Sequence, residues 1–301
     1  MDSISDGKNW SEVLAEISEV AHPLDLVRRK YLKKVSEITE RNVILYYSGW
    51  LHKNHESVSI HDIDKNGFMQ AIHKMDRRKG LDLILHTPGG DLGATESIVT
   101  YLDMMFDGDL RAIIPQLAMS AGTMLSFCTK EIVMGKHSDL EPIDPQLGGV
   151  ACQNVLDEFE QAKEEVRENP SSTALWQVII SKYHPTFLKQ CEHAVKWGKE
   201  LAEKWLGLNM LNPAIDQSAI HTIVDTFSDH SQQKTHGRHI SRQECKDLGL
   251  KVTDLENNQD LQDAVLKTHH ACMHTFANSD SVKIIENHKG VAFILQGNTP
   301  Q

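Results

Sequence analysis

The chain has 301 residues, of which 40% are hydrophobic and 24% charged, so it can bury a sizeable core like an ordinary globular protein. Its 42 acidic and 31 basic side chains give a formal net charge of −11, which argues against nucleic acid or an anionic membrane as a partner. The N-terminus has no signal-peptide pattern, and no run approaches the roughly 18 apolar residues of a membrane span. We therefore expect a cytoplasmic protein without a transmembrane helix.

The predicted elements begin with a charged helical arm over residues 1–40. From residue 41 onward, buried strands alternate with amphipathic helices. In chain order, the pattern predicts strand 42–51, helix 65–77, strand 81–86, helix 93–106, strand 111–119, helix 120–129 and strand 131–135. This alternation predicts an α/β fold with a parallel sheet, in which ligand sites lie where strands give way to helices.

The second half of the chain is predicted to be mostly helical over residues 152–229, which we interpret as an insertion and a candidate oligomer interface. This interpretation depends on buried helix faces and on three tryptophans, Trp176, Trp197 and Trp205. A short helix and strand then complete a main domain over residues 41–255. Residues 256–301 are predicted to form a C-terminal extension, a helix and a hairpin with HKG as its turn.

Metal and disulfide chemistry have little support in the sequence. The five cysteines are scattered and none has a CxxC spacing, which favours reduced thiols. His269 and His270 are neighbours, but no cysteine or carboxylate lies at ligand spacing from them. We therefore interpret this pair as solvated, and we expect no metal and no cofactor.

Two turns between a strand and a helix are rich in small residues: HTPGGD at 86–91 and AMSAGT at 118–123. Glycines permit positive φ and a close approach to the backbone, and amides at the start of a helix have no partner within it. Ser120 could therefore be a nucleophile beside amides that bind a developing oxyanion. The alternative is that Ser120 only caps a helix and that PGG is an ordinary turn.

Three ordered stretches carry a resemblance to a known family: LILHTPGGDLGATESIVTYL, RAIIPQLAMSAGTMLSF and EIVMGKHSDLEPIDPQ. Together with THGRHISRQECKDLGL, they resemble the serine dehydrogenase proteinase family over about residues 40–255. That family is related to the Clp protease proteolytic subunit, signal peptide peptidase A and the crotonases. The resemblance implies a Clp/crotonase fold of repeated β-β-α units and a serine peptidase. It assigns Ser120 as nucleophile and the amides of Gly90 and Ala121 as the oxyanion hole, with Gly89 shaping the turn.

The general base remains open. In the Clp subunit a histidine follows the serine by about 25 residues, but here that count reaches Asp144 and Pro145. Related membrane-associated peptidases use a lysine about forty residues on, and Lys163 lies 43 residues after Ser120. Its helical spacing from Leu156 and Phe159 could place it on their inward face, where burial would lower the pKa of its amine. Alternatively, Lys163 is a solvated lysine among acidic neighbours, Glu160, Glu164 and Glu165.

A second arrangement is a rearranged triad of Ser120, His236 and Asp144, because triads are defined by geometry and not by chain order. His137 is expected to hold a turn. Where the family has a glycine before PIDPQ, this chain has Glu141, which could alter substrate access.

We therefore expect an ATP-independent serine peptidase that acts on peptides or unfolded protein as a homo-oligomer. One alternative is a non-catalytic or partner-gated scaffold, regulated by a protein partner through the N-terminal arm. A less favoured one is acyl-CoA chemistry, for which no nucleotide-binding region is evident.

Overall fold

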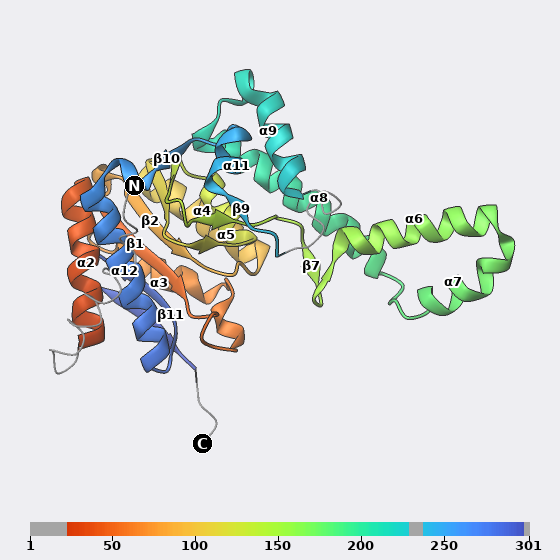
Figure 1. Ribbon diagram of the computed structural model, residues 1–301, viewed down its shortest axis with the longest axis horizontal. Helices are drawn as coiled ribbons and strands as arrows, with labels where there is room; N and C mark the ends of the chain where they lie inside the picture. Colours follow the sequence, from red (N-terminus) through yellow and green to blue (C-terminus); the bar gives the residue numbers. More distant parts are fainter. Residues whose placement is uncertain (1–22, 229–236, 298–301) are drawn as a thin grey trace, which may run out of the picture.

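The computed structural model describes residues 23–228 and 237–297, and a seven-stranded sheet forms its centre (Figure 1). Five neighbouring strands are parallel: β10 (Val252–Asp254), β5 (Glu131–Met134), β3 (Leu110–Ile114), β2 (Leu81–His86) and β1 (Asn42–Ser48). Every residue of β1 and β2 is buried, as expected for parallel strands that are covered on both faces. A mixed α/β fold with a mostly parallel sheet is thus confirmed, and the repeated β-β-α units remain a prediction.

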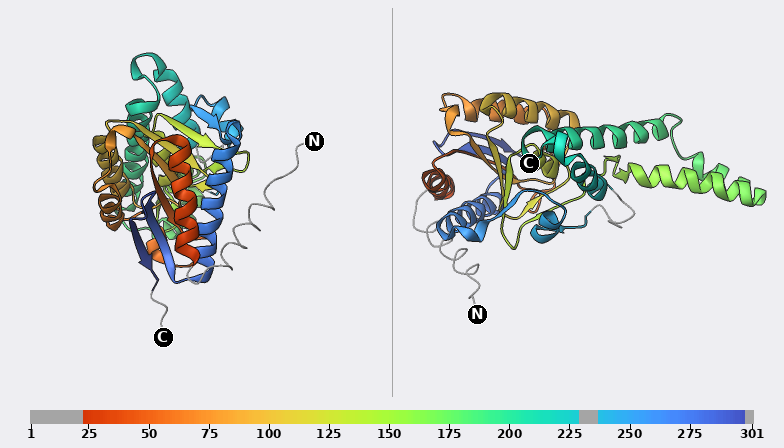
Figure 2. Two further views of the ribbon diagram at one scale, coloured as in Figure 1. Left: turned by 90° about the vertical axis from the view of Figure 1, so that its left-hand side faces the viewer. Right: turned by 90° about the horizontal axis from the view of Figure 1, so that it is seen from above.

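Helices cover both faces of this sheet (Figures 1 and 2). One face is covered by α2 (Pro23–Thr39) and α12 (Gln259–Asn278), and the other by α3 (Ile63–Ile72), α4 (Leu92–Phe106) and α5 (Ala121–Phe127). Alternate residues of β1 serve the two cores, with Leu45 and Tyr47 on the α2 side and Ile44 and Tyr46 on the other. Within the described ranges, no helix combines the length and the apolar character of a bilayer span.

The predicted strand 111–119 divides into two short strands in different sheets. After β3, the chain turns at Pro115, and β4 (Leu117–Ala118) pairs with β6 (Asp139–Leu140). A third strand, β9 (Ile240–Ser241), completes this small sheet. Proline has no N–H to donate to a ladder, which accounts for the break. The change of sheet carries the AMSAGT turn across to the end of β2, where Thr87 forms a bridge with Ala118.

The C-terminal hairpin is built into the central sheet. It consists of β11 (Ser281–Asn287) and β12 (Ala292–Gln296), joined through Gly290, whose φ is +82°. Strand β11 also pairs antiparallel with β1, from Ile44 opposite Asn287 to Ser48 opposite Lys283. The hairpin therefore shares one hydrogen-bonded sheet with β1 and β2. The division into an N-terminal arm, a main domain and a C-terminal extension remains a prediction.

The helical segment after residue 151 contains α6 (Cys152–Glu168), α7 (Thr173–Ile180), α8 (Phe187–Trp205) and α9 (Pro213–Ser228). Helices α6 and α7 project away from the rest of the molecule, and α8 returns beside α6 (Figure 1). We call residues 152–190 the projecting arm. Its base is held by Val155 and Cys191, whereas Trp205 at the end of α8 is fully buried in the main core. Leu175 and Val178 on α7 are each 60% exposed, so the arm carries apolar surface to solvent.

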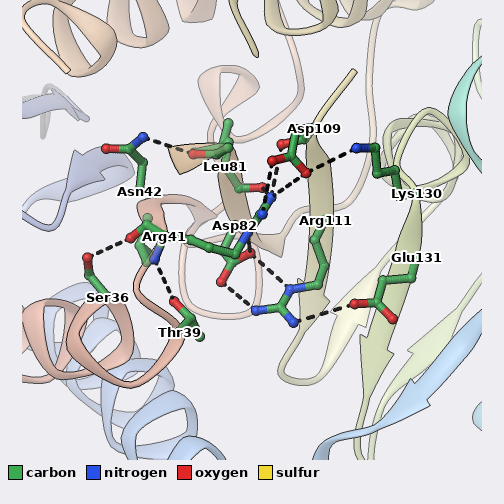
Figure 3. Close-up of polar contacts among 12 residues, drawn as sticks. Ser36, Thr39, Arg41, Asn42, Leu81, Asp82, Asp109, Arg111, Lys130 and Glu131 are labelled. Atoms are coloured by element: carbon green, nitrogen blue, oxygen red, sulfur yellow. Dashed lines mark hydrogen bonds and ion pairs between the residues drawn. The ribbon is translucent and has the colours of Figure 1, made fainter. Parts of the chain in front are cut away.

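An ion-pair network ties the amino-terminal ends of the parallel strands together (Figure 3). The fully buried carboxylate of Asp82 accepts from Arg41 at 2.7 Å and from two nitrogens of Arg111 at 2.9 and 2.7 Å. A buried carboxylate needs such charge-assisted donors, because removing one partner leaves an uncompensated charge. Asp109 and Glu131 complete the network. The network thus holds together the amino-terminal ends of the strands, whereas the two small-residue turns lie at their carboxyl ends.

Two buried histidines pack together, one at the start of the first of these turns and one in α12. His86, the last residue of β2, is fully buried, and its ring lies 4.1 Å from that of Trp50 and 5.3 Å from that of His269. The expectation that His269 and His270 are both solvated is wrong for His269, which is 8% exposed and also packs against Tyr47. Burial lowers the pKa of His86 to about 3, so this side chain is neutral in the folded protein.

This depressed pKa predicts acid sensitivity. Between pH 6.5 and about 3 the unfolded chain binds a proton at His86 that the native state does not, so stability is full above pH 6.5 and falls below it. The slope from this group is up to about 1.4 kcal/mol per pH unit. Urea unfolding at pH 7 and pH 5 should show a smaller loss for His86→Leu than for the wild type. An equal loss in both proteins would contradict the assignment.

Candidate active site

The two small-residue turns meet at the carboxyl ends of the strands. The amide of Thr87 donates to the carbonyl of Leu117 at 3.3 Å, and the amide of Met119 donates back to the carbonyl of Thr87 at 3.0 Å. Gly89, at φ +88°, lies so close to the second turn that an added Cβ would be 2.8 Å from the Cβ of Ser120. The packing therefore requires glycine at this position. The structure brings Gly89, Gly90, Ser120 and Ala121 together, as the sequence predicts.

Ser120 has a strained backbone. Its φ is +51° and its ψ is −115°, a region that residues with a Cβ rarely adopt and that costs of order 1–3 kcal/mol. The side chain is half-buried and makes no capping hydrogen bond to α5, the helix that it precedes. The helix-cap alternative is therefore wrong. Such strain is typical of functional residues that the surrounding structure holds in place.

The amides of Gly90 and Ala121 are available beside this serine. Ile60 forms a parallel bridge with the first turn: its amide donates to Gly89 at 2.8 Å, and its carbonyl accepts from Asp91 at 2.9 Å. Amides alternate in direction along an extended segment, so the Gly90 N–H faces away from Ile60. Ala121 is the first residue of α5 and has no intrahelical acceptor. Within the described residues, neither of these two amides donates a hydrogen bond.

A cleft of about 560 Å³ opens over the serine. It is lined by the two turns, by Ser59 and His61, and by residues of α8. Most of the side chains that line the cleft are apolar, namely Pro88, Leu92, Ala121, Met124, Ile143, Pro145, Leu147, Ala194 and Trp197. Trp197 is 41% exposed at the rim. The cleft thus has both an apolar lining and the exposed backbone of the two turns.

The structure does not bring Lys163 to this cleft. The side chain lies on α6 and is 65% exposed, and its ammonium is 2.6 Å from a carboxylate oxygen of Glu160. Leu156 and Phe159 pack into the base of the arm instead. The expectation that Lys163 shares their inward face is wrong, because α6 leaves the body of the protein and only one side of it is covered. Its pairing with an acid matches the solvated alternative.

The other residues predicted for the site, Asp144, His236 and His137, differ in where they lie. Asp144 is 2% exposed, between Ile143 and Pro145, which line the cleft. His236 lies outside the described residues. His137 belongs to a turn in which the amide of Ser138 donates to Gly135, as expected.

Glu141 lies beneath the active-site helix. It is 2% exposed, its backbone is not left-handed, and its amide and carbonyl both bond the hydroxyl of Thr123 in α5. It does not line the cleft. The expectation that this acid stands at a position that favours glycine and alters substrate access is therefore wrong.

His61 is a cleft residue that the sequence analysis missed. Its ring is exposed, and Nε2 lies 3.1 Å from the carbonyl oxygen of Glu56. It reaches the cleft only because Ile60 pairs with the glycine turn some thirty residues later, and no local pattern signals such a bridge. Among the described residues, no three His, Cys, Asp or Glu side chains form a group that could hold a metal ion.

Comparisons with known proteins identify a family for this chain. Residues 24–260 match the model of the ClpP-like SDH-type serine proteinases. Uncharacterized protein MJ0137 of Methanocaldococcus jannaschii is 26% identical over 244 residues, which are 76% of this chain and 74% of that protein. Uncharacterized protein MJ1495 of the same organism is 33% identical over 147 residues, which are 47% of this chain and 48% of the relative.

A solved structure of a mutant of the 1510-N membrane-bound stomatin-specific protease is also similar, at 13% identity and a TM-score of 0.38. That similarity covers 64% of this chain and 74% of the other. The family match spans both turns, Ser120 and the cleft, so the resemblance seen in the sequence is confirmed. The chain belongs to the family of ClpP-like SDH-type serine proteinases.

Proposed function

We propose that this protein is an ATP-independent serine endopeptidase that forms an acyl-enzyme on Ser120. One observation carries the proposal: a strained serine without a capping bond stands beside two unpaired backbone amides at the foot of an apolar cleft. The hydroxyl of Ser120 attacks the peptide carbonyl, and the amides of Gly90 and Ala121 donate to the oxyanion. Each such donor is worth about 10²–10³-fold in rate. The oxyanion then collapses, the peptide C–N bond breaks, and the amine leaves with the proton that the base took from the Ser120 hydroxyl. Water hydrolyses the resulting ester, which releases the acid product and restores the hydroxyl.

The proposed substrate is a peptide or an unfolded protein segment. Its backbone lies along the Gly89–Asp91 turn, and an apolar side chain of the substrate enters the cleft between Met124 and α8. The apolar lining of the cleft supports this substrate class. We further propose a cytoplasmic homo-oligomer, supported by the exposed apolar side chains of the projecting arm. A regulatory protein partner remains part of the proposal.

Intact mass after incubation with a fluorophosphonate tests this function. One adduct per chain, mapped to the peptide that contains Ser120, is the expected result. An assembled protein that forms no adduct would contradict a constitutive peptidase and favour the partner-gated or non-catalytic scaffold. Tight binding of a coenzyme A thioester without an adduct would instead favour acyl-CoA chemistry.

For the general base, we retain the Ser–Lys dyad over the triad of Ser120, His236 and Asp144, with one added requirement. Because Lys163 is exposed on α6, it must be supplied by the arm of a second copy. The exposed Leu175 and Val178 support an arm that contacts a neighbour. This requirement makes the base and the oligomer parts of one proposal.

Mixing two inactive variants tests this requirement. Ser120→Ala and Lys163→Ala homo-oligomers should each lose peptidase activity, Lys163→Ala by about 10²-fold or more because proton transfer is lost. Subunits exchanged between them should regain activity, since one chain supplies the serine and its neighbour the lysine. The variant His61→Ala tests the alternative that the general base comes from the same chain as Ser120. Full labelling of Lys163→Ala alone would contradict the dyad.

A further inference from the structure

A lysine lies fully buried in the middle of the protein. Lys283 of β11 is 0% exposed, and its ammonium contacts both carboxylate oxygens of Asp64 at 2.8 and 2.9 Å. Asp64 in α3 is also 0% exposed. Burying two charges has a desolvation cost that an apolar pair would avoid, so a buried ion pair is weak evidence for stability. The pair therefore calls for another explanation.

The remaining bonds of this ion pair lead to one short segment. Lys283 also donates to the carbonyl oxygen of Ser59 at 2.5 Å. The carboxylate of Asp64 accepts from the amide of His61 at 3.0 Å and from the hydroxyl of Tyr46 at 2.7 Å. Ser59 and His61 are thus both fixed by the same pair of side chains. A carboxylate with this many donors has little freedom to move.

Residues 59–61, which this ion pair fixes, in turn bind the glycine turn at residues 89–91 that carries the proposed oxyanion donor. Ile60, between Ser59 and His61, bonds the carbonyl of Gly89 and the amide of Asp91, on either side of Gly90. The contact is tight, because a Cβ on Gly90 would lie 2.2 Å from the amide nitrogen of Ile60. Any shift of Ile60 therefore moves the Gly90 amide relative to Ser120.

We propose that Lys283 is a positioning residue for the reaction: together with Asp64 it fixes residues 59–61, and these aim the Gly90 amide at the developing oxyanion. The inference rests on the proposed function. It makes the C-terminal hairpin part of the active-site apparatus, although β11 lies beyond the residues that match the family model. The role of the buried charges is then to fix the position of residues 59–61. An ion pair with directional hydrogen bonds specifies one position for this segment, whereas apolar contacts would allow several.

Fluorophosphonate labelling kinetics test this role. Lys283→Met should lower the maximal rate of inactivation about 10- to 100-fold, as expected for a misaimed donor, while the inhibitor concentration at half-maximal rate changes by less than about twofold. Because this variant leaves the Asp64 carboxylate uncompensated, the double variant with Asp64→Asn is measured as well. It should regain most of the lost melting temperature and remain at least about tenfold slow.

A second buried ion pair on the same strand provides the matched control. Arg28 and Glu286 are both 0% exposed and 2.6 Å apart, but they join β11 to α2 on the opposite face of the sheet. The variant Arg28→Met with Glu286→Gln should lose melting temperature and label at the wild-type rate. Wild-type labelling by the double variant of Lys283 and Asp64 would overturn the positioning role alone. A wild-type protein that never labels would overturn the proposed function and this inference with it.

Discussion

Replacement of Ser120 by alanine is expected to abolish the fluorophosphonate adduct and to lower peptide hydrolysis by about 10⁴-fold or more. The reason is chemical, since alanine has no oxygen that can attack a carbonyl or carry the acyl group. The cleft and the amides of Gly90 and Ala121 stay in place, so the variant should still bind peptide. Hydrolysis of a fluorogenic peptide and intact mass measure the two effects on the same sample.

Ser126→Ala, in the helix that Ser120 precedes, is the matched control. The Ser126 hydroxyl is buried and donates to the carbonyl of Gly122 at 3.2 Å, so its loss should cost about 1 kcal/mol of stability. Its adduct and its rate of hydrolysis should be those of the wild type. An adduct that persists in Ser120→Ala, or that disappears in Ser126→Ala, would place the nucleophile elsewhere.

The same site offers a test of strain. At φ +51°, Ser120 has a conformation that glycine adopts without a Cβ penalty. Ser120→Gly should therefore be inactive and yet about 1 kcal/mol more stable than Ser120→Ala in urea unfolding. Equal stability of the two variants would mean that the strain is small.

The parts of the fold that follow from local pattern were predictable. Runs such as LDLILH are mostly apolar and buried throughout because both faces of the parallel sheet are covered, and glycine or other small residues follow where the chain turns. The AMSAGT turn also carries its own signal, since a serine between a strand and Ala-Gly leaves helix amides unpaired. The local pattern therefore indicated Ser120 and Ala121 as candidates, the glycine turn indicated Gly89 and Gly90, and the resemblance supplied the roles that remain proposed for them.

The parts that depend on distant contacts were not predictable. Helical spacing relates Lys163 to Leu156 and Phe159, but it cannot say that α6 projects from the body with Lys163 in solvent. His61 and Lys283 reach the site region through a bridge to Gly90 and through pairing of β11 with β1. Neither pairing has a periodic signature, because each depends on which segments meet after folding.

Gly90→Ala is the second substitution with a large expected effect. A Cβ at this position would lie 2.2 Å from the amide nitrogen of Ile60 and 2.6 Å from its carbonyl oxygen. Both are backbone atoms, so the clash is relieved only if the bridge between the two segments opens. The Gly90 amide would then turn away from the oxyanion, and kcat should fall about 10²–10³-fold, as for the loss of one donor.

Loss of stability must be separated from loss of the donor, and Gly249→Ala does this. Gly249 also has a positive φ, +96°, but an added Cβ would meet no atom within 4 Å. The variant should lose about 1–2 kcal/mol through backbone strain alone and keep the wild-type kcat. If Gly90→Ala loses no more activity per folded molecule than Gly249→Ala, the Gly90 amide is not an oxyanion donor. If Gly90→Ala alone is slow and its KM is unchanged, the donor acts in the transition state, because weaker substrate binding would raise KM.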